Sequence, residues 1–346
     1  MDLEKLYRQV DEMLSKLDFD RIWPGFKPLR FALYDEEKCF FGGRYVEKTD
    51  DFCANTSIIY QGEQIAIWKA AEETDLSVLT SKMVHEMFHG FQRQQGWDCW
   101  PNETEALYRY TYDAENLALK LRENELLLAM LDRFDNASFR ELLSHRKRRR
   151  EKFPYEFSYE SKVEEIEGSA NFVEWQALRQ LDEKKAAALT DRMRVVLTKA
   201  ESLFPIRISG YFSGALMISA LLQAGCYSFD PAVRPAAALI LDKADPSDGG
   251  FPGKEACLRK VSDALRTFFA ETDAIIQAAL QRNEIVLRGP LELVSANIYD
   301  ARCCRGYITS TYFLMARDGT EDKLLYGNFV IRMKDEKTIE TVYRWE

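Results

Sequence analysis

The sequence predicts an α+β protein that is mainly helical, with a small N-terminal β-sheet and a small β region at the C-terminal end. Between about residues 103 and 281, apolar side chains recur every three or four positions, as on helices that pack against a core. On either side, shorter runs show the alternation and the turn residues of strands. With 346 residues, the chain is long enough for one elaborated domain or two domains.

The first hundred residues are predicted to hold a helix at each end and strands between them. The expected elements are a helix over 1–17, a strand over 29–34, a hairpin with strands 57–60 and 63–68, and a helix over 75–95. The dipeptide Gln61-Gly62 supplies the turn of the hairpin, in which Ile65 and Ile67 alternate with polar residues. Gly96 ends the second helix.

The rest of the chain is predicted to be helical up to about residue 281 and to consist of strands after Gly289-Pro290. The expected helices cover residues 103–133, 137–151, 159–181, 183–203, 209–224 and 255–281. The expected strands cover residues 291–299, 306–316, 323–333 and 338–345. We therefore expect one domain over residues 1–287, with a helical insertion at about 103–155, and a small β-rich C-terminal subdomain over residues 288–346.

The composition argues against several classes of partner. The net charge of −9 is the opposite of what a nucleic-acid-binding surface needs. The N-terminus lacks the pattern of a signal peptide, and the longest apolar run, residues 215–224, is too short and too broken to span a bilayer. Seven cysteines without an export signal indicate reduced thiols. We expect a cytoplasmic protein without nucleic-acid or membrane partners, and its oligomeric state is left open.

The motif that carries chemistry is His85-Glu86-Met87-Phe88-His89, an HExxH run that is followed directly by Gly90. The chain has only three histidines, and two of them stand four positions apart. On a helix, this spacing places both imidazoles on one face, where they can share a Zn²⁺ ion. Glu86 is then next to the metal, where it can take a proton from a metal-bound water. The motif predicts a catalytic zinc site with Glu86 as the base.

A catalytic zinc site usually has a third protein ligand, and the sequence offers several candidates. A metzincin pattern would need Gly and His where Gln92 and Gln95 stand, so that type is excluded. His145 is next to a run of basic residues and is interpreted as part of a solvated helix end. Glu105 follows His89 at a short spacing, but Asn102 is a good N-cap with Glu105 at the capping-box position, which explains Glu105 without a metal.

Glu167 is the stronger candidate for the third ligand. The helix around it carries an apolar stripe beside a polar, mostly acidic stripe that contains Glu160, Glu164 and Glu174. Gly168 follows directly, and a glycine in a helix costs about 1 kcal/mol relative to alanine, so it is expected to serve a close approach to another helix. Glu167 is therefore preferred, and the region of Glu103 and Glu105 remains the alternative.

An HExxHG run followed later by Glu-Gly-x-Ala on a second helix resembles the gluzincin zinc metallopeptidases, the thermolysin-like clan. The resemblance covers roughly residues 55 to 225 and implies a zincin-like fold with a zinc site of three protein ligands, His85, His89 and Glu167. It also implies that Glu86 is the general base. The chain departs from the compact members because 77 residues separate His89 from Glu167. This segment is interpreted as a helical insertion.

The resemblance also implies how a substrate is held. In this clan a strand at the edge of the sheet, just before the motif helix, aligns the peptide, and the hairpin over residues 57–68 is where it is expected here. Tyr211 resembles a tyrosine that donates a hydrogen bond to the oxyanion in some related peptidases. Glu164 or Glu174 is expected to hydrogen-bond a ligand histidine, and the sequence does not choose between them.

The expected function is that of a zinc metallopeptidase that hydrolyses peptide bonds in peptide or protein substrates. One alternative is a non-catalytic protein that keeps the fold for binding or regulation. The intact Glu86 argues against it, because a purely structural metal site needs no base. Another alternative is a zinc hydrolase of a non-peptide substrate, because HExxH fixes only a metal that activates water.

Overall fold

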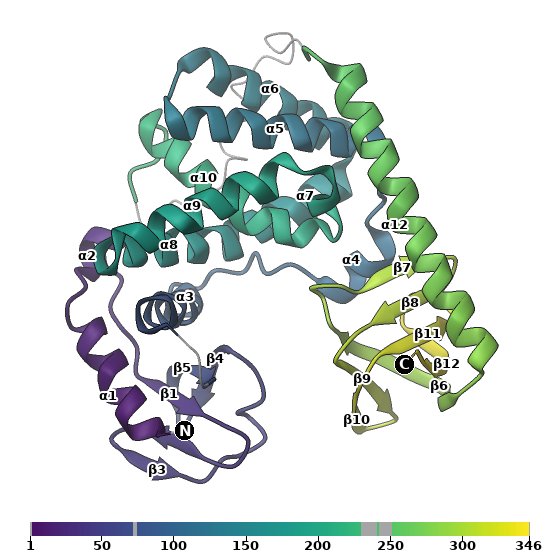
Figure 1. Cartoon of the computed structure of the whole chain (residues 1–346), viewed down its shortest axis with the longest axis horizontal. Helices are drawn as coiled ribbons and strands as arrows, with labels where there is room; N and C mark the ends of the chain where they lie inside the picture. Colours follow the sequence, from purple (N-terminus) through teal and green to yellow (C-terminus); the bar gives the residue numbers. More distant parts are fainter. Residues whose placement is uncertain (1, 72–74, 230–240, 242–250, 346) are drawn as a thin grey trace. The chain divides into compact units, whose positions relative to one another are not determined.

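The computed structural model describes residues 2–71, 75–229, 241 and 251–345, and confirms the predicted α+β class with many helices and two β-sheets (Figure 1). The chain forms two compact units, and each is built from separate stretches of sequence. The first unit contains residues 1–100, 164–195 and 214–236, and the second contains residues 101–163, 196–213 and 237–346. No helix within the described residues combines the length and the apolar character that a bilayer crossing requires.

The first unit is built around a five-stranded sheet with the strand order β3-β2-β1-β5-β4. Its strands are β1 (Phe31–Tyr34), β2 (Cys39–Phe41), β3 (Arg44–Val46), β4 (Thr56–Tyr60) and β5 (Glu63–Lys69). Its helices are α1 (Leu3–Leu14), α2 (Phe19–Ile22), α3 (Leu76–Gln94), the π-helical turn η1 (Glu164–Gly168) and α8 (Ser169–Leu181), together with parts of α9 (Glu183–Thr198) and α10 (Ile206–Gln223). Helix α3 packs against β4 and β5 and also against α8, so it is covered from both sides (Figure 1).

The predicted hairpin and the predicted motif helix are both confirmed. Strands β4 and β5 pair up to Tyr60 and Glu63, and Gln61 (φ 51°) and Gly62 (φ 81°) adopt the left-handed conformations of a type I′ turn. Asp75 caps α3 by accepting hydrogen bonds from two backbone N–H groups. At the other end, Gly96 (φ 70°) terminates the helix in the left-handed conformation that glycine adopts without strain.

The helix predicted over residues 159–181 contains a π-helical turn, η1, which the apolar periodicity did not indicate. Here Gly168 meets Gly214 of α10 within the first unit. A Cβ atom on Gly168 would lie 2.5 Å from the Gly214 Cα atom, and one on Gly214 would lie 2.5 Å from the Glu164 carbonyl oxygen. The predicted close approach at Gly168 is thus present, and it brings two backbones together without side chains between them.

The second unit joins helices to a seven-stranded antiparallel sheet with the order β10-β9-β6-β12-β11-β8-β7. Its strands are β6 (Ile285–Ala296), β7 (Arg302–Cys304), β8 (Tyr307–Ser310), β9 (Phe313–Asp318), β10 (Glu321–Tyr326), β11 (Phe329–Met333) and β12 (Thr338–Arg344). Its helices are α4 (Glu103–Arg109), α5 (Ala114–Asp132), α6 (Asn136–Lys152), α7 (Pro154–Val163), the 3₁₀ turn η2 (Ala200–Leu203), the first part of α10 and α12 (Lys254–Arg282).

The division into units differs from the predicted boundary between residues 287 and 288. The C-terminal sheet does not stand alone, because α12 packs on four of its strands and α4 packs on β6 and β7. Ile276 and Ala279 of α12 share a buried cluster with Val330 and Tyr343 of the sheet. The segment predicted as a helical insertion, 103–155, supplies α4, α5 and α6 to this same unit.

The sequence predicted too few strands in this sheet, and the strand expected over 291–299 begins earlier, since β6 covers Ile285–Ala296. The run over residues 306–316 is split between β8 and β9, where Tyr312 has a φ of 66°, and the run over 323–333 is split at Gly327. Both interruptions reverse the chain within a stretch that keeps the alternation of a single strand. The three-residue strands β2, β3 and β7 were not predicted, because three residues are too short to show a period.

A network of buried charges holds the helices of the second unit together. The Arg149 guanidinium is fully buried and donates to Glu123 (3.0 Å) and Glu160 (2.5 Å) from its two terminal nitrogens. Arg146 pairs with Glu123 at 3.3 Å. The interpretation of this basic run as a solvated helix end was therefore wrong, because charged side chains can be buried when each finds an opposite charge within reach. His145 is buried as well.

The contact between Gly168 and Gly214 predicts the sign of a mutational effect. Helix propensity alone would make Gly168→Ala more stable by about 1 kcal/mol. The clash with backbone atoms should instead destabilise the protein by about 1–3 kcal/mol, measured as the free energy of unfolding in urea. Gly90→Ala in α3 is the comparison, because its Cβ would meet only side-chain atoms, which can move, and it should cost less. A Gly168→Ala protein more stable than wild type would contradict the close contact.

The buried network gives a second stability prediction. Arg149→Met should lower the free energy of unfolding by about 3–5 kcal/mol, because Glu123 and Glu160 would be left buried without their shared cation. Arg148→Met is the matched control in the same helix, and as a surface-type change it should stay within about 0.5 kcal/mol. Equal effects of the two substitutions in urea denaturation would show that burial of the Arg149 charge does not matter.

Candidate metal centre

Helix α3 places the two histidines of the HExxH motif one turn apart. His85 and His89 are 7% and 6% exposed, so both imidazoles are buried. The apolar side chains of Val84, Met87 and Phe88 on the same helix are also buried. Because α3 is covered on two sides, the histidines are in a desolvated environment and not at an open helix face.

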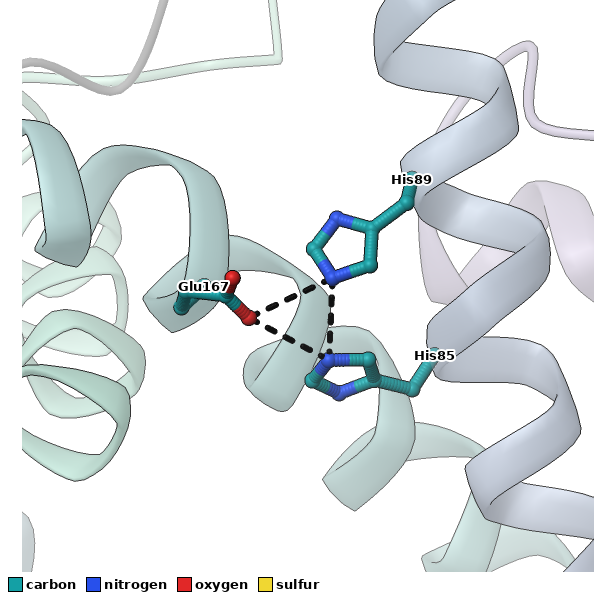
Figure 2. Close-up of side chains that lie close together, drawn as sticks. All are labelled: His85, His89 and Glu167. Atoms are coloured by element: carbon teal, nitrogen blue, oxygen red, sulfur yellow. Dashed lines mark hydrogen bonds and ion pairs between the residues drawn. The ribbon is translucent and has the colours of Figure 1, made fainter. Parts of the chain in front are cut away.

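The third predicted ligand, Glu167, belongs to the π-helical turn η1 and is 8% exposed. Such turns interrupt an α-helix by a single wide turn and are frequent at functional sites. Figure 2 shows that the Glu167 carboxylate and the rings of His85 and His89 point toward one another from the two elements. The structure therefore brings Glu167 and His89 together, although 77 residues lie between them in the sequence.

The three donor atoms form a compact triangle. The Nε2 atoms of His85 and His89 are 3.1 Å apart, and the Glu167 Oε2 atom lies 3.6 Å from the first and 3.3 Å from the second. Around a tetrahedral zinc ion with bonds of 2.0–2.1 Å, neighbouring ligand atoms are separated by about 3.3 Å. Within the part of the chain that the structure describes, this is the one group of three or more possible ligands that converge in this way.

The donor set therefore fits a zinc ion in both chemistry and size. Two imidazole nitrogens and one carboxylate oxygen make up a ligand set of catalytic zinc sites, which leave one position for water or substrate. His85, His89 and Glu167 are the residues that would hold the ion.

Each histidine is also held by its other ring nitrogen. The Nδ1 atom of His85 lies 3.1 Å from the Glu174 carboxylate, and the Nδ1 atom of His89 lies 2.8 Å from the Gln92 side-chain oxygen. Partners at this position orient a metal-ligating histidine and are typical of metal sites. Of the two acids expected in this role, Glu174 is thus seen to hydrogen-bond His85.

The carboxylates around His85 change its proton affinity. Burial alone would lower the pKa of His85, but hydrogen bonds to Glu167 and Glu174 outweigh it and raise the pKa to about 10. For Glu174, burial raises the pKa, and the hydrogen bond and charge of His85 outweigh it and lower the pKa. Without a metal, this arrangement favours a proton on His85, which a metal ion has to displace in order to bind.

Glu86 is in a different position from the other acids. Its side chain is half-buried, and burial raises its pKa, while the charges of His85 and His89 act in the opposite direction. It makes no hydrogen bond or ion pair with any residue that the structure describes, whereas Glu174 is engaged with His85. A carboxyl group with a raised pKa and no partner among the described residues remains available to exchange a proton.

The alternative third ligands are used elsewhere. Asn102 caps α4 by accepting from the Glu105 N–H (3.1 Å), so its predicted role as N-cap is confirmed, while the Glu105 carboxylate pairs with Arg109. Glu103 pairs with Arg207 and accepts a hydrogen bond from Tyr159. All of these residues belong to the second unit.

Tyr211 and His145 also belong to the second unit. The Tyr211 hydroxyl accepts a hydrogen bond from Arg207 (3.2 Å) and lies 3.2 Å from the Tyr299 hydroxyl. The predicted role of Tyr211 toward an oxyanion is not tested by these contacts and stays a prediction. His145 is buried near Glu141, and burial lowers its pKa.

Two residues of this region were not identified from the sequence as part of the site. Gln92 was used only to exclude the metzincin pattern, although a polar residue one turn after His89 on the same helix could have been recognised as its partner. The Trp100 ring lies 5.8 Å from the His89 ring, and the Arg93 guanidinium stacks on the indole at 4.4 Å. No period in the sequence connects Trp100 with the motif, since a turn separates them.

The ligand set predicts which substitutions remove the metal. Purified protein should carry about one zinc ion per chain in elemental analysis. His85→Ala or His89→Ala should abolish zinc binding, because the two ligands that remain are too few to hold the ion. Glu167→Gln should weaken binding strongly, while Glu105→Gln is the matched control and should bind as wild type. Loss of zinc in Glu105→Gln together with retention in Glu167→Gln would overturn the third ligand.

Comparisons of the chain with protein-family models, with curated proteins and with solved structures found no significant match.

Proposed function

We propose that this chain is a zinc-dependent hydrolase that cleaves peptide bonds, with the gluzincin type of ligand set. The observation that carries the proposal is the convergence of His85, His89 and Glu167 at the spacing of a tetrahedral zinc site. Glu86, next to His85 in the motif, is proposed as the base. A structural zinc site is closed by four protein ligands, whereas three ligands and a carboxyl group without a protein partner are typical of a catalytic site.

In the proposed reaction, Glu86 transfers the proton, and Glu174 and Gln92 hold the histidines. When bound, zinc supplies a Lewis acid that polarises a carbonyl group and makes water more acidic. Glu86 takes the proton of the attacking water and delivers it to the nitrogen of the leaving amine. Glu174 and Gln92 hold the two imidazoles in place, so that the reacting groups meet a fixed arrangement of side chains.

The position of β4 supports a peptide as the substrate. This strand is at the edge of the sheet in the first unit and packs against α3, which carries His85 and His89. Its outer side has no strand partner among the described residues, so its backbone can pair with an extended peptide. Tyr211 is proposed to donate to the oxyanion, as the resemblance implies.

The proposed compartment is the cytoplasm. All seven cysteines are free thiols, as expected in a reducing environment. The acidic balance of the chain, with a net charge of −9, supports a peptide or protein substrate over a nucleic acid.

The role of Glu86 is tested by separating metal binding from turnover. Glu86→Gln should retain zinc and lose peptide cleavage by about 10²–10⁴-fold, because the amide cannot accept the proton of the attacking water. Cleavage of a diverse peptide library, followed by mass spectrometry, provides the measurement, and Glu105→Gln serves as the active control. A zinc-loaded wild-type protein that cleaves no peptide would overturn the proposed reaction and favour the non-peptide hydrolase or the binding protein.

A further inference from the structure

Gln92 is a buried side chain next to the candidate metal centre, and both its amide oxygen and its amide nitrogen make hydrogen bonds. It is fully buried, one turn after His89 on α3, although the neighbouring residues Arg93 and Gln94 are exposed. A buried amide is tolerated only when its hydrogen-bonding groups find partners. The Oε1 atom of Gln92 lies 2.8 Å from His89 Nδ1, and its Nε2 atom lies 2.9 Å from the Ile166 carbonyl oxygen and 2.8 Å from the Ser169 hydroxyl.

These partners determine which way the amide faces. The carbonyl oxygen of Ile166 can only accept a hydrogen bond, so the nitrogen of the Gln92 amide has to be on that side. The Ser169 hydroxyl donates its hydrogen to the carbonyl of Glu165 and is left as an acceptor, which agrees with the same orientation. The amide oxygen of Gln92 therefore faces His89.

The orientation of the amide in turn determines the tautomer of His89. An amide oxygen only accepts, so the Nδ1 atom of His89 carries a hydrogen, and in the neutral ring the Nε2 atom is then the bare nitrogen. Nε2 is the atom that belongs to the triangle with His85 and Glu167. A backbone carbonyl of η1 thus decides, through Gln92, which nitrogen of His89 is free to bind a metal.

We propose that Gln92 is a positioning residue with two tasks: it selects the metal-binding tautomer of His89, and it ties α3 to η1, the two elements that supply the ligands. This inference rests on the proposed zinc site, but it concerns the metal-free protein as well. The tie is direct, because Gln92 belongs to α3 and its two acceptors, at Ile166 and Ser169, flank Glu167. The spacing between the histidine and carboxylate ligands is therefore held by the amide even without an ion.

Three substitutions separate the two tasks. Gln92→Met keeps the approximate shape of the side chain and removes both tasks. Gln92→Glu keeps an oxygen that accepts from His89, so it retains the tautomer and weakens the tie. Ser169→Ala removes one hydrogen bond of the tie but leaves the Ile166 carbonyl to orient the amide, so it should retain the tautomer.

The tautomer is read by ¹⁵N–¹H correlation of the imidazole rings in the metal-free protein, in which only three histidines contribute signals. Wild type, Gln92→Glu and Ser169→Ala should show the hydrogen of His89 on Nδ1, whereas Gln92→Met should lose this preference. Zinc affinity, measured by competition with a chelator, should fall by about 10–100-fold in Gln92→Met. In Ser169→Ala, which keeps the hydrogen bond to the Ile166 carbonyl, the affinity should fall by less than in Gln92→Met.

An unchanged His89 tautomer in Gln92→Met would overturn the proposal, and so would a change of tautomer in Gln92→Glu. If Gln92→Met does not fold, the Gln92→Glu and Ser169→Ala proteins still decide it, because both are expected to keep the hydrogen on Nδ1. None of these readouts uses peptide cleavage. Failure of the proposed reaction would therefore leave the tautomer pattern in place, while failure of the Gln92 proposal would leave peptide cleavage in place.

Discussion

The packing of α3 against η1 and α8 is the contact on which the rest of the candidate site depends. It brings a carboxylate and two imidazoles so close that their donor atoms are 3.1–3.6 Å apart in a desolvated space. Three groups with lone pairs gain little from one another at such distances unless a proton or a cation is shared among them. The partners on the far side of each ring, Glu174 and Gln92, make this arrangement persistent, since they prevent the imidazoles from rotating away.

Much of this arrangement could be predicted from the sequence where the signal is local. The hairpin around Gln61-Gly62 and the motif helix up to Gly96 depend on residues that are close in the chain, and turn and cap chemistry identifies them. Glu167 could be preferred because a glycine directly after it makes little sense on an isolated helix. In that case, Gly168 was a sign in the local sequence of a contact with a distant part of the chain, Gly214.

The features that could not be predicted share a different origin. The burial of Arg149 and the orientation of Gln92 depend on partners from other helices, and the π-helical turn η1 meets α10 at Gly214. A run of basic residues has the same composition whether it faces water or meets Glu123 and Glu160 in a core. The periodicity of a sequence shows which positions are apolar. It does not show that charged residues form ion pairs with one another in the core.

The path of the chain between the ligands has a consequence for the stability of the folded state. After Trp100 the chain leaves the first unit, builds helices of the second, and returns to the first unit at Glu164, three residues before the carboxylate that faces His85 and His89. An ion held by these side chains links two stretches of the first unit that are far apart in sequence. Because this site exists only when both stretches are folded together, binding of the ion stabilises the folded state by mass action. Binding of a metal ion would therefore stabilise the first unit, and unfolding of the first unit would release the ion. The ion would act as a reversible cross-link between the two stretches of chain.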